Sequence, residues 1–576
     1  MAAATRRLRI ALLLVAFIMS IFAGRLLQWQ GVEASSYAHA ASKARLSEIT
    51  LPATRGDITD ANGVPLATTV ETVAVTADPL RTRPDAMQIA ATLAPILRVP
   101  AEELLPKLRK QNTRFVYLAR KVPAERWKQA DEALDEKDLT GVYSHADPLR
   151  SYPAGSVAAN VIGFVGAEGH GLAGLEYALD DKLHGRDGLM IYERGLGGRQ
   201  IPLAPHTERA PVPGTSVMLT IDRDLQYFAQ RAISEQVERT KSRSGDVVVL
   251  DVKTGEILAL ATAPTYNPNR PTDSPAEQRI NRPLQEVYEP GSVVKVLTTA
   301  ALLDAGYVTP DTKLTVPGSL TRDGHTIHDY WAHGTINLTM TGALAKSSNI
   351  GTVLAAERMP KSEHARYLRA FGLGQPTGIG LPGEASGSLA DPDSWSDLRR
   401  ATVSFGQGLS VNAVQMASAI GTVANGGVRV QPTLVKGMID DAGKLRPGPE
   451  PKRTRVIGAK AAKQVARMME QVVGGEDALA TKAQIPGYRV AGKTGTAERV
   501  DPECGCYRGY TASFAGFAPA DAPRFVVYVA LQDPKRGGNS GSALAAPVFQ
   551  DIMAAALQKY RVPPTGTSTP VMPLTW

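Results

Sequence analysis

The sequence predicts an α+β fold built on an antiparallel sheet that helices back. Two runs of β-branched and apolar residues, 246–251 and 256–261, flank a Lys-Thr-Gly turn, as in a hairpin, and residues 524–531 form a third such run. Helical spacing of apolar residues is present at 225–237 and after Pro547, where one face carries Phe549, Ile552, Met553, Ala556, Leu557 and Tyr560. Because strands lie at both ends of this region, we expect the terminal helices to back the sheet and a helical subdomain to be inserted between them.

Length and charge narrow the class of protein. At 576 residues, with 43% hydrophobic and 21% charged residues, the chain is long enough for two or more globular domains. Its net charge of +8 fits a protein that works near anionic lipid or wall polymer. Arginine is spread throughout, and no stretch combines dense basic residues with aromatic ones, so we expect no nucleic-acid partner.

The amino terminus carries a candidate membrane anchor. Three arginines within residues 1–9 precede the apolar run 10–24, and a helix in which Arg25 snorkels can continue to residue 29, close to the ~20 residues that a spanning helix needs. A signal peptide is the competing interpretation, but the cleavage-like Ala-His-Ala at 38–40 lies well beyond the apolar core. We expect an uncleaved anchor at 10–29, with residues 1–9 in the cytoplasm and the rest outside.

The stretch from Tyr288 to Lys295 carries the candidate nucleophile. Pro290 and Gly291 precede an apolar run, so Ser292 should lie in the first turn of a buried helix, with Lys295 on the same face. A lysine whose pKa is lowered can take the proton from such a serine. Alone the pattern is not specific, because a capping serine followed by a solvated lysine has the same spacing.

Two further motifs make the Ser292–Lys295 pattern specific for one family. Ser347-Ser348-Asn349 follows an apolar segment, and Lys493-Thr494-Gly495-Thr496 precedes strand-like residues 513–517. S-x-x-K, S-D-N and K-T-G in this order are typical of penicillin-binding proteins and class A β-lactamases, and here Ser348 occupies the aspartate position. The chain therefore resembles the penicillin-binding serine D,D-transpeptidases. A second K-T-G, at Lys253, falls before the nucleophile and inside a hairpin, so we exclude it.

The resemblance implies a role for each catalytic residue. Lys295 would be the neutral base for Ser292, and Lys493 would supply a second cation that lowers the pKa of Lys295. Ser347 would relay the proton to the leaving amine, and Asn349 would hold Lys295 and the substrate amide.

The resemblance also places the substrate. Thr494, Gly495 and Thr496 should form an edge strand. The hydroxyls of Thr494 and Thr496 would bind the terminal carboxylate of the substrate beside Lys493. Backbone N–H groups of Ser292 and Thr496 would form the oxyanion hole. No metal and no cofactor is implied.

Residues 30–210 resemble the amino-terminal pedestal (dimerisation) module of class B, monofunctional penicillin-binding proteins. The resemblance rests on residues 55–67, which predict a hairpin with an Asn62-Gly63 turn, and on 150–155, 160–163 and 171–176. It implies buried ion pairs among Arg55, Arg150 and Glu176. No glycosyltransferase motif is found there, so we expect a monofunctional enzyme. The predicted layout is a cytoplasmic tail (1–9), an anchor (10–29), a pedestal (30–210), a transpeptidase domain (211–560) and a disordered tail (561–576).

Two other groups of residues could carry chemistry. His325, His328 and His333, near Asp323 and Asp329, lack a standard zinc spacing, so a solvated loop is the preferred interpretation. Cys504 and Cys506 are permitted to form a disulfide outside the cell, but the C-x-C ring is tight and free thiols stay open. We assign the two cysteines no catalytic role.

The function that the resemblance implies is cross-linking of peptidoglycan. Ser292 would attack between the two terminal D-alanines of a stem peptide and pass the acyl group to an amine on a neighbouring strand; β-lactams would trap the same serine. The motifs look more like the division branch (FtsI type) than the elongation branch, which implies a membrane partner of the FtsW glycosyltransferase type and other division proteins. The alternatives are an elongation enzyme, a β-lactam hydrolase or sensor, for which no E-x-x-L-N motif is found, and an inactive wall-assembly scaffold.

Overall fold

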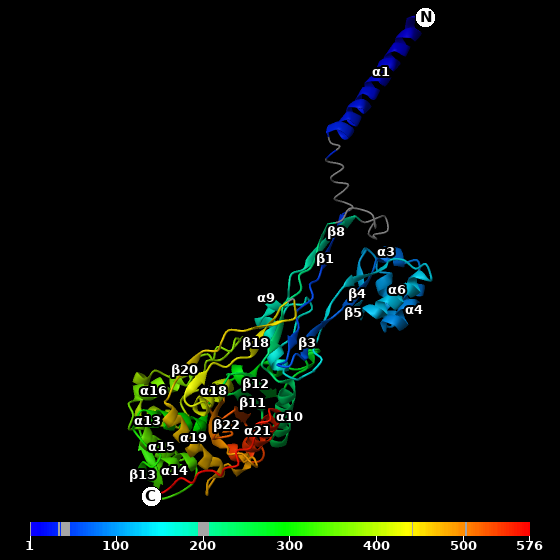
Figure 1. Cartoon of the computed structure of the whole chain (residues 1–576). Helices are drawn as coiled ribbons and strands as arrows, with labels where there is room; N and C mark the ends of the chain where they lie inside the picture. The colour runs from blue at the N-terminus through cyan, green and yellow to red at the C-terminus, as the bar shows by residue number, and fades with distance from the viewer. Residues whose placement is uncertain (1, 33–34, 36–45, 194–206, 441, 502–503) are drawn as a thin grey trace. The chain divides into compact units, whose positions relative to one another are not determined.

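The structure is a computed structural model that describes the chain except residues 1, 33–34, 36–45, 194–206, 441 and 502–503 (Figure 1). Contacts divide the chain into two compact units. The first unit comprises Met1–Thr54, Glu71–Pro148 and Gly185–Gly214, and the second comprises Arg55–Val70, Leu149–His184 and Thr215–Trp576.

The first unit begins with the helix α1 (Ala2–Leu27), which continues into a π-helical turn, Gln28–Val32. Among the described residues, one helix, Ala4–Gly31, is long and apolar enough to cross a membrane, and its apolar side chains are exposed. The predicted anchor at 10–29 lies within it. The helix fits a single-pass membrane protein.

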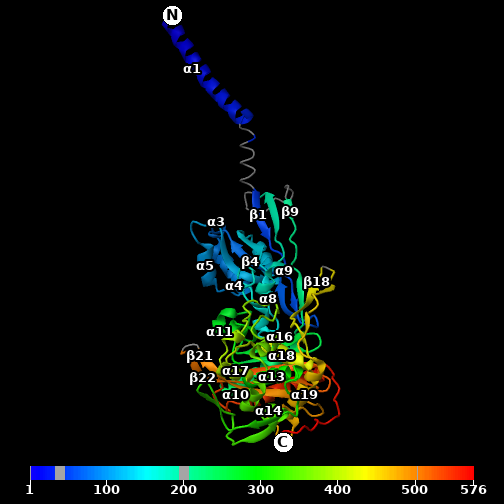
Figure 2. The same ribbon diagram turned by 90° about the vertical axis from the view of Figure 1, so that its left-hand side faces the viewer.

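The rest of the first unit is two small sheets and a helical layer. In one sheet β1 (Leu46–Leu51) pairs with β8 (Gly188–Glu193), which pairs with β9 (Thr207–Arg209). The other has the order β5-β4-β6 (Val116–Pro123, Thr72–Ala77, Val142–Ala146). Buried side chains of this second sheet pack with those of α4 (Ala86–Leu97), α5 (Ala101–Leu108) and α6 (Ala124–Asp135), and the short α3 (Pro79–Thr82) follows β4. Figure 2 labels β4, α3, α4 and α5.

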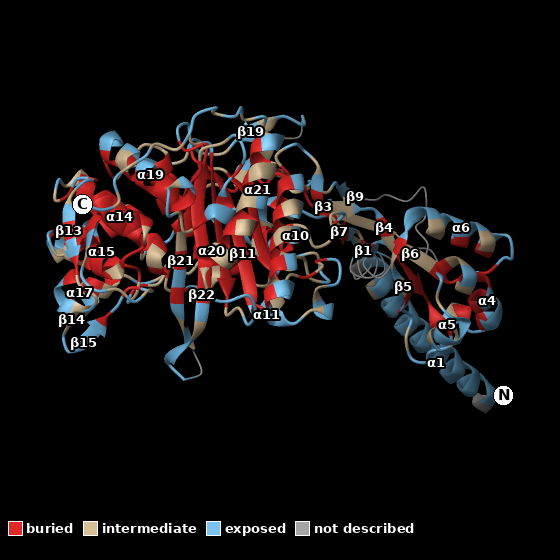
Figure 3. Cartoon of the chain, turned by 90° about the horizontal axis from the view of Figure 1, so that it is seen from below, coloured by how far each residue is buried: buried red, intermediate tan, exposed pale blue. Residues whose placement is uncertain are grey.

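The second unit is built on a five-stranded antiparallel sheet. Its order is β12-β11-β23-β22-β21, or Ile257–Ala263, Ser244–Asp251, Phe525–Gln532, Cys506–Ala518 and Ala491–Asp501. The predicted hairpin at 246–261 and the predicted strand at 524–531 are thus confirmed. Figure 3 shows this sheet as a buried layer between helices.

Alternate residues of one strand show how the sheet is covered. In β11, Val247 and Val249 pack with side chains of α10 (Arg223–Thr240) and α21 (Ala546–Lys559). Val248 and Leu250 face the other way, into a core that contains α13 (Lys295–Asp304), α18 (Ala413–Ala424) and α19 (Ala459–Gly474). The terminal helices therefore back one face and the inserted helices cover the other, which confirms the predicted α+β architecture.

A second, six-stranded sheet joins distant segments of the second unit. Its order is β19-β18-β10-β2-β3-β7, or Leu445–Pro447, Val435–Ile439, Ser216–Leu219, Ile58–Thr59, Pro65–Val70 and Leu149–Ser151. The predicted hairpin at 55–67 is β2 and β3. Its turn is held by Asp60, whose carboxylate accepts the N–H groups of Asn62 (2.9 Å) and Val64 (2.8 Å), while Gly63 has the positive φ of 82°.

The expected buried ion pairs are present in the second unit. Glu176, with a fully buried side chain, binds Arg55 through Oε2 (2.6 Å) and Arg150 through Oε1 (2.7 Å). Arg55 also donates to the Glu176 carbonyl oxygen and to Asp180 (2.6 Å). Because Arg55–Val70 and Leu149–His184 group with the transpeptidase segments, the predicted boundary at 210 stays a prediction.

The prediction of a disordered tail is wrong. The Leu574 carbonyl accepts the Thr339 N–H (3.0 Å), and the Pro573 carbonyl accepts the Thr339 hydroxyl (2.7 Å), at the end of β16 (Ile336–Thr339). The Pro570 carbonyl accepts the Gln471 side chain (2.6 Å). A tail without a core of its own is thus held by main-chain hydrogen bonds to the helical subdomain, which composition does not reveal.

We predict that Glu176→Gln lowers the free energy of unfolding of the second unit by roughly 3–5 kcal/mol, because it leaves two buried guanidinium groups without their shared carboxylate. The measurement is the midpoint of urea denaturation. The matched control is Glu235→Gln, which breaks the exposed Arg231–Glu235 pair on α10 and should cost less than about 1 kcal/mol. Equal shifts in the two variants would show that the buried pairs add nothing.

Candidate active site

Ser292 lies in a short 3-10 turn, Gly291–Val294, that leads into α13. Gly291 has φ of 57°, and its N–H donates to the Gly406 carbonyl (3.0 Å), which fixes the entry of the turn. The helix after it is buried along nearly its whole length, which is why the sequence is apolar on every face there. Lys295, its first residue, is fully buried.

The Ser-Ser-Asn motif connects two helices by a strained residue. Ser347 follows α14 (Met340–Ala345) and has φ of 58°, a conformation that few residues other than glycine adopt. Ser348 then caps α15 (Asn349–Ala356), accepting the Gly351 N–H (2.9 Å). The turn directs both the carbonyl and the hydroxyl oxygen of Ser347 toward the lysines.

The Lys-Thr-Gly-Thr motif lies on β21, the edge strand of the five-stranded sheet, as predicted. A Cβ atom at Gly495 would lie 2.2 Å from the Ser513 hydroxyl and 3.0 Å from a methyl group of Val293. Glycine at this position therefore lets the strand approach the turn that carries Ser292.

The two lysines share one serine. Lys295 Nζ donates to the Ser347 carbonyl (2.6 Å), to the Asn349 side chain (2.7 Å) and, at 3.4 Å, to Ser347 Oγ. Lys493 Nζ donates to the same Ser347 Oγ (2.9 Å) and to Thr494. Within the described part of the chain, the Ser292 hydroxyl has no hydrogen bond, so it is free to meet a substrate.

These motifs meet in a cavity of about 230 Å³. Five predicted residues line it: Ser292, Ser347, Asn349, Thr494 and Thr496. Lys295 and Lys493 lie behind them, and Gly495 shapes the strand. Other lining residues were not identified from sequence: Tyr330, Phe405, Gln407, Leu479 and Ser540 to Ser542. The three glycines within residues 537–541 are the only sequence signal near this part of the lining, and the structure gives the reason for one of them, since a Cβ at Gly541 would clash with the Ser513 carbonyl.

Burial lowers the pKa of both lysines. Removal from water lowers the pKa of Lys295 to about 7, and the Asp329 carboxylate opposes this shift. Burial lowers the pKa of Lys493 well below its usual value, and the neighbouring Lys295 lowers it further. The predicted repulsion between the two ammonium groups thus falls on the pKa of Lys493, while burial accounts for that of Lys295. Near neutral pH Lys295 can exist as a free amine.

Asp329 is the main residue of the site that sequence analysis missed. Its fully buried carboxylate accepts the Ser348 hydroxyl (2.6 Å) and the N–H groups of Asn349 and Ile350 at the start of α15. His333 Nε2 lies 3.0 Å from it. The prediction of a solvated loop therefore holds for the exposed His325 but is wrong for Asp329, which bonds to the start of α15, and for His333, whose side chain is buried against Asp329.

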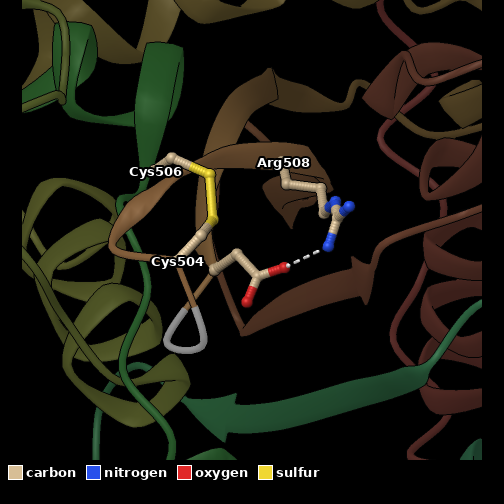
Figure 4. The surroundings of a disulfide bond; sticks show 4 residues. Cys504, Cys506 and Arg508 are labelled. Atoms are coloured by element: carbon tan, nitrogen blue, oxygen red, sulfur yellow. Dashed lines mark hydrogen bonds and ion pairs between the residues drawn. A yellow bond between two sulfur atoms is a disulfide. The ribbon is translucent and has the colours of Figure 1, made fainter.

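Cys504 and Cys506 form a disulfide near the tip of the β21–β22 hairpin (Figure 4). The disulfide is the first of the two alternatives left open by sequence. Arg508, on the same hairpin, pairs with Asp501 (3.4 Å). Neither cysteine lines the cavity that contains Ser292.

Comparisons with known proteins identify the family of the chain. Residues 245–554 match the penicillin-binding protein transpeptidase domain, and residues 50–219 match the penicillin-binding protein dimerisation domain. The chain belongs to the penicillin-binding protein transpeptidase family, and within it to the class B D,D-transpeptidases with an amino-terminal dimerisation domain.

Particular relatives cover most of the chain. It is 39% identical to penicillin-binding protein PbpB of Mycolicibacterium smegmatis (91% of this chain, 86% of the relative) and 36% identical to peptidoglycan D,D-transpeptidase FtsI of Escherichia coli K12 (89% and 85%). Penicillin-binding protein 3 of Mycobacterium tuberculosis, solved with ampicillin, has a TM-score of 0.72 at 33% identity and covers 92% of this chain and 100% of its own. The chain is accordingly a D,D-transpeptidase, an enzyme that acts on peptidoglycan and binds β-lactams.

We predict that the rate constant for acylation by a β-lactam rises with pH along a limb near pH 7, because Lys295 accepts a proton only as the free amine. Asp329→Asn removes the charge that opposes deprotonation of Lys295, so the limb should move to lower pH. Its plateau should fall on the order of tenfold, because buried N–H groups lose a charge-assisted acceptor.

The measurement is acylation kinetics between pH 5 and 9. Asp323→Asn, on the same loop but exposed, is the matched control and should leave the limb in place. A limb that stays in place or moves to higher pH in Asp329→Asn would contradict the proposed electrostatic coupling.

Proposed function

We propose that the protein cross-links peptidoglycan stem peptides through an acyl-enzyme on Ser292, in septal wall synthesis during cell division. The observation that carries the chemistry is the pair of buried lysines that share Ser347 at the rear of the cavity containing Ser292. Hydrogen bonds to Ser347 and Asn349 hold the Lys295 amine at the rear of the cavity, and in this proposal the Ser292 hydroxyl bonds to that amine once substrate is bound.

The proposed reaction uses these residues in turn. Ser292 Oγ attacks the carbonyl carbon between the terminal D-alanines and gives its proton to the neutral amine of Lys295. The C–N bond then breaks, and Ser347 relays a proton to the departing amine of D-alanine. An amine of a neighbouring strand attacks the acyl carbon, and its proton passes through Lys295 to Ser292 Oγ as the acyl C–O bond breaks.

Other residues hold the substrate in this proposal. The backbone N–H groups of Ser292 and Thr496 stabilise the oxyanion. Thr494 and Thr496 bind the terminal carboxylate beside Lys493, and Asn349 holds the substrate amide while it fixes Lys295. Gly495 keeps the strand close enough for these contacts.

Transpeptidation is favoured over β-lactam hydrolysis and over a scaffold role. The relative named peptidoglycan D,D-transpeptidase and the dimerisation domain at 50–219 support transpeptidation over hydrolysis, and the mycobacterial relative solved with ampicillin supports β-lactam binding. The intact set of Ser292, Lys295, Ser347 and Lys493 supports catalysis rather than a structural role.

The septal role is inferred from the relatives, and the membrane orientation from the charges that flank the helix. The similarity to FtsI supports the division branch, with the elongation branch as the alternative. Arginines ahead of the membrane helix favour a cytoplasmic amino terminus and an extracytoplasmic catalytic domain. A transpeptidase without its own glycosyltransferase needs glycan strands made nearby, so a membrane partner of the FtsW type would contact α1 and the pedestal.

We predict that the full-length chain in detergent forms a stable adduct with a labelled penicillin. Ser292→Ala and Lys295→Arg should both abolish labelling, the second because guanidinium does not deprotonate in a protein. Lys460→Arg, at an exposed position on α19, is the control and should label normally. Rapid release of the label would indicate a hydrolase, absence of label in the wild type would indicate a scaffold, and labelling of Lys295→Arg would exclude Lys295 as base.

We predict that depletion of the protein in its own cell gives filaments or chains without septa, because division would lack its cross-linking enzyme. The measurement is microscopy of depleted cells, with re-expression of the wild type and of Ser292→Ala as paired controls. Cells that become round while still dividing would assign the enzyme to elongation instead.

A further inference from the structure

A group of metal-ligating side chains lies in the second unit, away from the cavity containing Ser292. Within the described residues, His170, Asp180 and His184 place one ligand atom each within 4.8 Å of one another. The His170 and His184 rings are stacked, 4.4 Å between centroids, and His170 Nδ1 lies 2.9 Å from Asp180 Oδ2. We propose that these three residues bind a zinc ion.

The backbone brings the ligands together in two ways. Asp180 and His184 are four residues apart, at the start and the end of the one-turn helix α9 (Asp180–Leu183), so both can reach the same side. His170 ends a tight turn, in which its carbonyl accepts the Gly166 N–H (2.8 Å). Three ligands from two short, anchored segments leave a fourth position for water.

The surroundings of Asp180 orient it as a ligand. Its Oδ1 atom accepts hydrogen bonds from Arg55 (2.6 Å) and from the Gly171 N–H (2.9 Å), which leaves Oδ2 for the metal. Partners of this kind hold metal ligands in place in known sites. Arg55 and Arg150 together face two carboxylates, Glu176 and Asp180, so the charge of Asp180 is already paired with Arg55 and the two imidazoles must supply most of the affinity for the ion.

The donor set selects the metal. Two imidazoles and one carboxylate are ligands that zinc accepts, whereas Mg²⁺ and Ca²⁺ prefer oxygen. Ligand atoms of a tetrahedral zinc site lie about 3.3 Å apart, which follows from Zn–N distances near 2.0–2.1 Å. The two imidazole rings are stacked at an interplanar angle of 14°, so their in-plane lone pairs do not meet at one point, and zinc binding requires His170, whose side chain is 58% exposed, to rotate.

The bound ion would join two segments of the second unit. The α9 turn is already hydrogen-bonded to two other segments of this unit. The carbonyls of Leu183 and Lys182 accept the N–H groups of Gly56 and Thr215 (2.8 Å each). A metal between His170 and His184 would tie this turn to the segment beside the Arg55–Glu176 pair. The expected effect is a rise in thermal stability without a change in acylation.

The test is zinc binding by the full-length chain in detergent after removal of metal with a chelator. Calorimetry should find one bound Zn²⁺ per chain, unaffected by excess Mg²⁺. Co²⁺ in place of Zn²⁺ should give the visible absorption of a four-coordinate site with nitrogen ligands.

Variants locate the ion. His170→Gln and His184→Gln should each weaken binding at least about tenfold, since even loss of a group that only supports a ligand costs that much. His325→Gln, at an exposed histidine of another loop, should bind as the wild type. No binding by the wild-type chain, a six-coordinate Co²⁺ spectrum, or unchanged affinity in both variants would overturn the proposal. Penicillin labelling of the same samples reports folding and is independent of the result.

Discussion

The active site depends on keeping two lysine side chains out of water. Lys295 and Lys493 are both fully buried, and burial lowers the pKa of each. Two cations cannot be brought so close in a dry site at low cost, so the arrangement favours loss of a proton. The packing that buries them requires close approach of β21 to the turn that carries Ser292, and Gly495 makes that approach possible.

A single buried carboxylate, that of Asp329, opposes the effect of burial on the pKa of Lys295. Asp329 lies at the amino terminus of α15, where it accepts main-chain N–H groups and the Ser348 hydroxyl. It thereby fixes Asn349, which in turn holds Lys295, and it opposes the shift in the pKa of that lysine. The carboxylate that the S-D-N pattern would place at position 348 is here contributed by a different segment and still contacts residue 348.

A buried carboxylate also fixes buried cations in the segments that precede the transpeptidase sequence. Arg55, Arg150 and Glu176 are distant in sequence and meet in one buried network, which continues through Asp180 to the surface. Groups of this kind contribute little net stability over apolar packing, but the loss of one partner is costly. They hold the β2–β3 hairpin, β7 and α9 together within the second unit.

The sequence by itself determined the α+β class, the β11–β12 hairpin, the membrane helix and the three motifs, because residue composition, apolar length and residue spacing are local properties. It did not reveal that the Asp329 carboxylate raises the pKa of Lys295, that the tail binds β16, or that Arg55–Val70 groups with the second unit. Each of these depends on contacts between segments far apart in the chain. The lowered pKa of Lys295 was expected from chemistry, but only tertiary structure decided its cause, since burial is a property of the packed molecule.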